Sequence, residues 1–231
     1  MINLVAVKSQ KKRIVMSLSG VLISGVCVGF MKVAAFGVDP FQVLVSGLDH
    51  TIPIDFGTLY VLINAVMLLF SLIADRHNIG IATFINLFLL GYVVDFTKAA
   101  LALLFPAPGM LLRIGFMVFG IVVLCIGSAL YMTADLGVST YDAVAIVMSK
   151  KWKWGQFQYV RICTDLACVL SGGLLIYLSS RSIGEVTASI GVGTIVTAFF
   201  MGPLIEFFNE KIARPMLGKS KNGKGSPSDS V

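Results

Sequence analysis

Charged residues are scarce in this chain of 231 amino acids. They make up 13% of the sequence, whereas 57% of the residues are hydrophobic. A soluble domain carries about 25% charged residues, so the chain lacks the polar surface that water would require. This shortage excludes an ordinary soluble domain and predicts an all-α, multi-pass membrane protein whose first partner is the lipid bilayer.

Histidine and cysteine are also rare, with two histidines and four cysteines. The cysteines all lie in apolar segments, and the sequence contains no CxxC or Cys/His cluster. We therefore expect neither a disulfide framework nor a metal site. The chain also lacks HExxH, GxSxG, P-loop and Rossmann patterns in a suitable setting, so we expect no cofactor and no enzymatic activity.

The formal net charge of +6 does not indicate a nucleic-acid partner. The lysines and arginines lie at the chain ends and between apolar runs, which is how membrane orientation signals are distributed. Placing both termini on the cytoplasmic side keeps most cations inside. We therefore predict a cytoplasmic basic N-terminus over 1–13 and a cytoplasmic, disordered basic tail over 210–231.

Six apolar runs are long enough to cross a bilayer, which needs about 20 residues per helix. The first run is longer than the apolar region of a signal peptide, so we expect it to be retained. The predicted spans are 14–36, 58–74, 79–104, 111–134, 156–179 and 189–208.

The chain contains an internal repeat. The stretch AFGVDPFQVLVSGL over 35–48 matches DLGVSTYDAVAIVM over 135–148, and the third spans align with Asp95 opposite Glu206. The sequence thus divides into transmembrane repeats over 14–104 and 110–209. Because each repeat has an odd number of spans, we expect the two to be inverted relative to each other, an architecture common in transporters.

Each copy of the repeated stretch predicts a turn followed by a half-helix. Gly37 and Gly137 permit a tight turn, and Asp39 and Ser139 are suitable N-caps for helices over 40–49 and 140–150. These helices are too short to cross the bilayer. They either lie in the interface or dip inward and return, and an inward helix start would favour a polar ligand.

The first repeat contains the motifs FGVDPFQVL, FGTLY and GIATFINLFLLGYVVDF, and the second contains their counterparts LGVSTYDAV, WGQFQ and GVGTIVTAFFMGPLIEFF. In these motifs the chain resembles the YczE-like (YczE/YyaS/YitT-type) bacterial integral membrane proteins. The chain departs from the family pattern at Asp39, where the family has serine, and at Thr140-Tyr141, where it has Pro-Trp. The resemblance implies a bacterial inner-membrane location and this fold, and it implies no particular substrate.

Ionisable side chains inside spans are costly and are functional candidates. Arg161 and Asp165 are four residues apart on one helical face and form either a substrate- or proton-coupled pair or a structural ion pair. Asp95 and Lys98 form a second candidate pair. Asp142 lies three residues after the Ser139 cap, where a carboxylate usually supports capping.

Together these features predict a permease-like protein that moves or binds a small polar molecule or ion between the repeats. The expected ligand-binding residues are Gly37, Asp39, Asp95, Lys98, Gly137, Ser139, Asp142, Arg161 and Asp165. The alternative is a non-transporting accessory protein that modulates a partner, with an apolar patch around Trp152 and Trp154. A membrane-embedded enzyme is a weaker third alternative. The sequence is also compatible with assembly into a homo-oligomer.

Overall fold

The computed structural model describes residues 4–75, 79–155 and 157–217, and these residues form helices and no strands. The tail predicted over 210–231 lies outside the described residues from 218 onward. The helices are α1 Leu4–Ala34, α2 Pro40–Thr51, α3 Phe56–Ala74, α4 Ile81–Leu104, α5 Met110–Thr133, α6 Thr140–Ile146, the π-helix Val147–Lys151, α7 Phe157–Ser180, α8 Ile183–Ser189, α9 Val192–Phe208, the π-helix Asn209–Ala213 and α10 Arg214–Leu217.

The prediction of an all-helical membrane protein is confirmed. By length and composition, six helical segments can cross a membrane: Gln10–Ala34, Phe56–Ala74, Ile81–Leu104, Met110–Thr133, Tyr159–Ser180 and Ile183–Met201. A short helix follows the first span of each half, α2 in one and α6 in the other. Helices suit the bilayer because they satisfy their backbone hydrogen bonds internally.

The last span, predicted over 189–208, is α9 over Val192–Phe208, and it is preceded by the short helix α8, which was not predicted. The backbone is extended at Ile190 and Gly191, so a break separates α8 from α9. The Gly191 N–H donates to the Thr194 hydroxyl at 3.4 Å, and Gly80 donates to Thr83 in the same way at 3.2 Å. The segment that is long and apolar enough to cross a membrane, Ile183–Met201, thus contains a helix start that hydropathy alone does not reveal.

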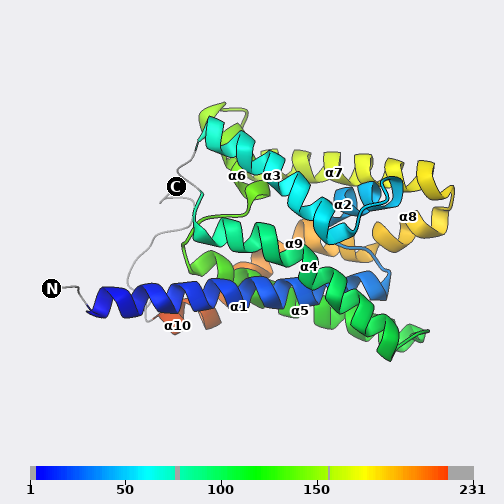
Figure 1. Cartoon of the computed structure of the whole chain (residues 1–231), viewed down its shortest axis with the longest axis horizontal. Helices are drawn as coiled ribbons and strands as arrows, with labels where there is room; N and C mark the ends of the chain where they lie inside the picture. The colour runs from blue at the N-terminus through cyan, green and yellow to red at the C-terminus, as the bar shows by residue number, and fades with distance from the viewer. Residues whose placement is uncertain (1–3, 76–78, 156, 218–231) are drawn as a thin grey trace.

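Helices α1 and α5 lie side by side along one edge of the molecule (Figure 1). Glycines on both helices lie at this contact. A Cβ at Gly20 would lie 2.6 Å from the Gly127 carbonyl oxygen, and a Cβ at Gly120 would lie 2.7 Å from Met31 Cγ. Small residues at these positions allow the two helices to approach each other closely.

The first span of each half ends in the same backbone conformation. Ala35 and Asp135 both have φ of 54°, and Gly37 and Gly137 have φ of 104° and 113°. A positive φ is costly for most side chains and routine for glycine. Both places therefore have two positive-φ residues within three positions, and the twin turns predicted from the sequence are confirmed.

Each turn is held by the third span of the opposite half. Gly193 of α9 donates its N–H to the Phe36 carbonyl at 2.8 Å, and Ala82 of α4 donates to the Leu136 carbonyl at 3.0 Å. A Cβ on Gly37 would lie 2.6 Å from Gly191 N. The turn glycines thus face packed backbone, and their role is to position the half-helices.

The two half-helices begin between the ends of the molecule. Arg13 donates to the Ala134 carbonyl at 3.2 Å and Arg113 to the Ala34 carbonyl at 2.8 Å, so α1 and α5 are antiparallel and end at opposite sides. Those ends are roughly 30 Å apart at 1.5 Å per residue. The linkers, of five residues over 35–39 and six residues over 134–139, span at most about 17 Å and about 20 Å when extended, so the starts of α2 and α6 meet only if both linkers run inward.

Candidate functional site

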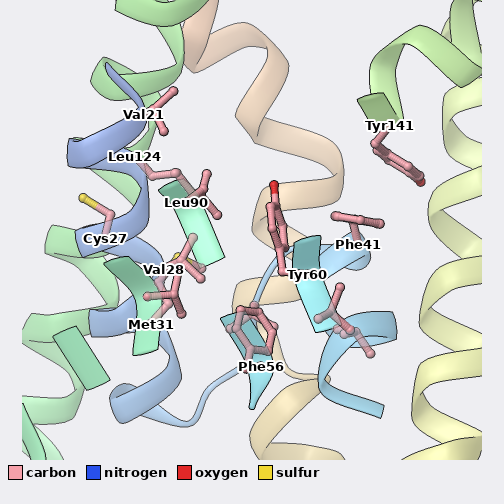
Figure 2. Close-up of a cluster of buried hydrophobic side chains, with 14 of the residues drawn as sticks. Val21, Cys27, Val28, Met31, Phe41, Phe56, Tyr60, Leu90, Leu124 and Tyr141 are labelled. Carbon is pink, nitrogen blue, oxygen red and sulfur yellow. The ribbon is translucent and has the colours of Figure 1, made fainter. Parts of the chain in front are cut away.

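The half-helix starts meet at an aromatic stack. The rings of Phe41 on α2 and Tyr141 on α6 are stacked, with centroids 4.9 Å apart and an interplanar angle of 23°. Tyr60 of α3 contacts Phe41 edge-on at 5.7 Å. Figure 2 shows the three side chains in a row, with the Tyr141 hydroxyl pointing toward the pale yellow ribbon of α7.

A charged cluster lies beside this stack, between α6 and α7. The Arg161 guanidinium forms an ion pair with Asp142, and its Nε donates to Asp165 Oδ1 at 3.2 Å. The Tyr141 hydroxyl donates to the same Asp165 oxygen at 2.7 Å, and the guanidinium lies 4.3 Å from the Tyr141 ring centroid. The i, i+4 ion pair predicted within α7 is therefore confirmed, and Arg161 of this pair also binds Asp142 in the first turn of α6.

The helix caps belong to the same region. Asp39 Oδ1 accepts from the backbone N–H groups of Phe41 at 3.0 Å and Gln42 at 3.3 Å. Ser139 Oγ accepts from the Asp142 N–H at 3.1 Å and donates to the Asp142 carboxylate at 2.6 Å. Both predicted N-caps are confirmed. Asp142 is thus shared between capping α6 and binding Arg161.

The cluster is partly withdrawn from solvent and carries excess negative charge. The side chains of Arg161, Asp142 and Asp165 are 32%, 27% and 15% exposed. Two carboxylates face one guanidinium. The Asp39 carboxylate interacts electrostatically with Arg161 and Asp165 and also with Lys32, so Asp39 and Lys32 together add no further net charge. In a low-dielectric environment an unbalanced charge is expensive, so the cluster favours a proton or a cationic group.

A neutral polar chain extends from the stack into the first half, and sequence reasoning missed it. The Tyr60 hydroxyl donates to Asn86 Oδ1 at 3.0 Å, Asn64 Nδ2 donates to the Tyr60 carbonyl at 2.7 Å, and the Thr140 hydroxyl donates to Asn64. The signal was the i, i+4 spacing of Tyr60 and Asn64 within an apolar span. Gln42, the counterpart of Asp142, is 3% exposed, and within the described residues its Oε1 has no hydrogen-bond partner.

Asp95 and Lys98 form no salt bridge in the described residues, although Asp95 interacts electrostatically with Lys32 and, more weakly, with Lys98. Asp95 Oδ2 accepts the Gly57 N–H at 2.5 Å, at the positive end of α3. Lys98 is exposed, and among the described residues it forms no ion pair with Asp95. The Gly57 N–H at the start of α3 is thus the hydrogen-bond partner of Asp95, a role that we predicted for Lys98. The repeat counterpart Glu206 pairs with Arg214 at 2.9 Å.

Metal-ligating side chains do not gather in the described residues. Over 4–75, 79–155 and 157–217, no group of three or more His, Cys, Asp or Glu side chains could hold a metal ion. The chemistry that the site offers is therefore that of its carboxylates, its guanidinium, its amides and its aromatic faces.

Sequence comparisons match this chain to uncharacterized proteins, one of which is described as a membrane protein. It is 28% identical over 207 residues to an uncharacterized protein of Haemophilus influenzae, covering 89% of this chain and 87% of the relative. It is 25% identical over 173 residues to the uncharacterized membrane protein YczE of Bacillus subtilis (75% and 74%) and 22% identical over 205 residues to YyaS of the same organism (88% and 96%).

No solved structure matches the chain. The model of a family of unknown function, DUF6198, matches residues 11–210, which include all six spans and the cluster at Arg161. The relatives support the YczE-like resemblance seen in the repeated motifs. This chain is a bacterial-type, multi-pass helical membrane protein that belongs to the DUF6198 family.

Proposed function

We propose that this protein is a permease-like membrane protein that binds, and moves, a small polar molecule or ion between two inverted repeats. The observation that carries the proposal is the position of the charged cluster. Arg161, Asp142 and Asp165 lie where the starts of the two half-helices meet, at the Phe41–Tyr141 stack. Transporters built from inverted repeats bind their substrates at such an interface.

The reciprocal contacts support the inverted arrangement. The turn after α1 is held by α9, and the turn after α5 is held by α4. Helix α2 packs on α7 of the other half, and α6 packs on α3. In the proposed mechanism, the halves rock against each other about the Phe41–Tyr141 stack, and the packed glycine contacts of α1 and α5 act as the pivot.

The charge of the cluster narrows the class of ligand. Each carboxylate already receives a hydroxyl hydrogen bond, from Ser139 or Tyr141, in addition to Arg161. The net charge of the cluster remains negative, which favours binding of a proton or a small cation over binding of an anion. Catalysis is not part of this proposal.

The test is ligand-dependent thermal stabilisation of the purified full chain, screened over inorganic cations, organic cations, anions and neutral metabolites. We expect cations to raise the unfolding temperature and Asp165→Asn to abolish that rise. Lys98→Gln, at an exposed site outside the cluster, is the matched control. Stabilisation that survives in both Asp165→Asn and Arg161→Ala would remove the site assignment.

Any ligand found in this screen is then tested for movement across a bilayer. Uptake into proteoliposomes by the unmodified chain, absent with Asp165→Asn, would separate transport from binding alone. Binding without uptake would leave a binding protein and reject the permease.

A second candidate, a membrane accessory protein, has one observation in its favour. Trp152 and Trp154 are 45% and 65% exposed, contact each other at 5.3 Å and extend an aromatic row from Phe70. Tryptophan is enriched at protein interfaces, and it also anchors proteins at the membrane surface. Replacing both with alanine would remove partner binding while leaving ligand stabilisation unchanged if this function is the correct one.

A further inference from the structure

The structure contains an apolar groove on a side of the molecule that the proposed transport site does not use. The groove has a volume of about 460 Å³ and lies between α5 and α9. Its lining is entirely apolar and includes Phe36, Met117, Val118, Ile121 and Val196. This volume lies in the range of small-molecule sites in proteins, roughly 300–1,000 Å³.

The groove is open to the surroundings of the helices. Met110 and Val118 of α5 and Val192 of α9, which all line it, are 62%, 57% and 68% exposed. Because α5 is a membrane span, the neighbour available at this surface is lipid hydrocarbon. An acyl chain matches both the apolar lining and the elongated course of the groove along α5 from Met110 to Val122.

A cation lies at the edge of this groove. Arg113 is three residues after Met110 and four before Met117, so it flanks the lining stripe on the helix surface. Its guanidinium lies 4.7 Å from the ring centroid of Phe36, which itself lines the groove. Its Nε donates to the Ala34 carbonyl at 2.8 Å and its Nη2 to the Ala35 carbonyl at 3.2 Å.

The carbonyls of Ala34 and Ala35 hold the guanidinium in place without neutralising it. Among the described residues, Arg113 takes part in none of the ion pairs. Arginine has five N–H donors and a strong geometric match to phosphate. An apolar groove with an uncompensated guanidinium at its edge complements one molecule in particular, a phospholipid with net negative charge.

We propose that this groove binds an anionic phospholipid, with an acyl chain between α5 and α9 and the phosphate at Arg113. The bound chain would contact Phe36, whose carbonyl accepts the Gly193 N–H and whose successor is the turn glycine Gly37. Lipid occupancy would therefore stabilise the junction between the first turn and α9. This inference does not depend on the proposed transport function.

The test uses the full chain purified in detergent with phosphatidylglycerol or phosphatidylcholine of equal chain length as probes. Binding is measured by native mass spectrometry and by the shift in unfolding temperature. We expect phosphatidylglycerol to bind more tightly, and Arg113→Gln to reduce that preference about fivefold to tenfold, since tenfold corresponds to 1.4 kcal/mol.

A second pair of variants keeps the proposal testable if Arg113→Gln folds poorly. Val118→Trp fills the groove, whereas Val66→Trp places the same side chain on α3 at a site that is 70% exposed and outside the groove. We expect Val118→Trp to weaken binding of both lipids and Val66→Trp to leave it unchanged. Equal binding of both lipids by the unmodified chain, or equal behaviour of the two tryptophan variants, would overturn the proposal and indicate nonspecific lipid contact.

Discussion

The turn before α2 and the turn before α6 share a backbone and differ in chemistry. Both reverse at a residue with φ of 54° followed by a positive-φ glycine, and both lead to one ring of the Phe41–Tyr141 stack. Beyond the rings the halves diverge. The first half contributes the neutral groups Tyr60 and Asn64 and one carboxylate, the α2 cap Asp39, whereas the second half contributes the ion-paired Asp142, Arg161 and Asp165.

This difference shows which properties the fold itself requires. Glycine at the two turns and the aromatic contact are needed in both halves, because they set where each half-helix begins. The ion pairs are not needed for that purpose, since α2 begins with the same geometry and its cap Asp39 forms no salt bridge within the described residues. We therefore propose that the half with the ion-paired cluster carries most of the ligand chemistry and that the first half is mainly its structural counterpart.

The most direct test of the difference between the two halves is to remove the Arg161 guanidinium. Arg161→Met leaves Asp142 and Asp165 without their cation, and breaking a buried ion pair costs about 3–5 kcal/mol, less here because the group is one-third exposed. Asn64→Leu, the neutral counterpart, should cost about 1–3 kcal/mol because the Thr140 hydroxyl loses its acceptor. Unfolding temperatures followed by the fluorescence of Trp152 and Trp154 measure both.

Adding Asp165→Asn to Arg161→Met should restore part of the lost stability, since it removes one unpaired charge. An equal loss for Arg161→Met and Asn64→Leu, without rescue, would show that the charged half has no special electrostatic role.

The turn glycines should be equally sensitive in the two halves. Gly37→Ala and Gly137→Ala each force a side chain into a positive-φ conformation, at about 1–3 kcal/mol. Each new Cβ would also lie 2.6 Å or 2.5 Å from the backbone nitrogen of Gly191 or Gly80. Gly115→Ala is the control, because nothing lies within 4 Å of a Cβ there, and alanine favours the helix. A large difference between Gly37→Ala and Gly137→Ala would contradict the equivalence of the turns.

The tyrosine hydroxyls should differ between the halves by a smaller amount. Tyr141→Phe removes a hydrogen bond to the carboxylate of Asp165, at about 1.5–3 kcal/mol, whereas Tyr60→Phe removes one to the amide of Asn86, at about 0.5–1.5 kcal/mol. Both variants keep the rings and their contacts. Denaturation in detergent checks the ranking, and a larger loss for Tyr60→Phe would reverse our assignment of the two halves.

The smallest effect is expected when the caps are exchanged. Asp39→Ser keeps a good N-cap on α2 and should change stability by less than about 0.5 kcal/mol, because Ser and Asp cap about equally well. Asp39→Ala should cost about 1 kcal/mol by the same measure. If Asp39→Ser instead abolishes cation-dependent stabilisation, the Asp39 carboxylate belongs to the ligand site and the first half contributes to the ligand chemistry.

Much of the fold was predictable because its signals are local. The apolar runs and their breakers located the spans, and Gly37-Val38-Asp39 and Gly137-Val138-Ser139 located the turns and caps. The Arg161–Asp165 pair followed from its i, i+4 spacing. These features depend on residues close together in the chain, where helical geometry fixes the distances.

The misses involve contacts between distant residues. Asp95 was predicted to pair with Lys98, three residues away, whereas it accepts the Gly57 N–H at the start of α3 and interacts electrostatically with Lys32 more strongly than with Lys98. No role was predicted for Asn64 and Asn86, because a neutral amide within a span costs less free energy than a charge and does not by itself indicate a site. The helix α8 was not predicted, because only the tertiary structure shows that a short helix precedes the break at Ile190–Gly191.

The sequence by itself determined that this chain is a helical membrane protein with two similar halves, since hydropathy and repetition are properties of the chain alone. Only the tertiary structure decided that the two half-helices meet, that Asp142 joins Arg161, and that each turn rests on the third span of the other half. Those outcomes depend on packing between segments more than 150 residues apart, and no local pattern records which helix face meets which.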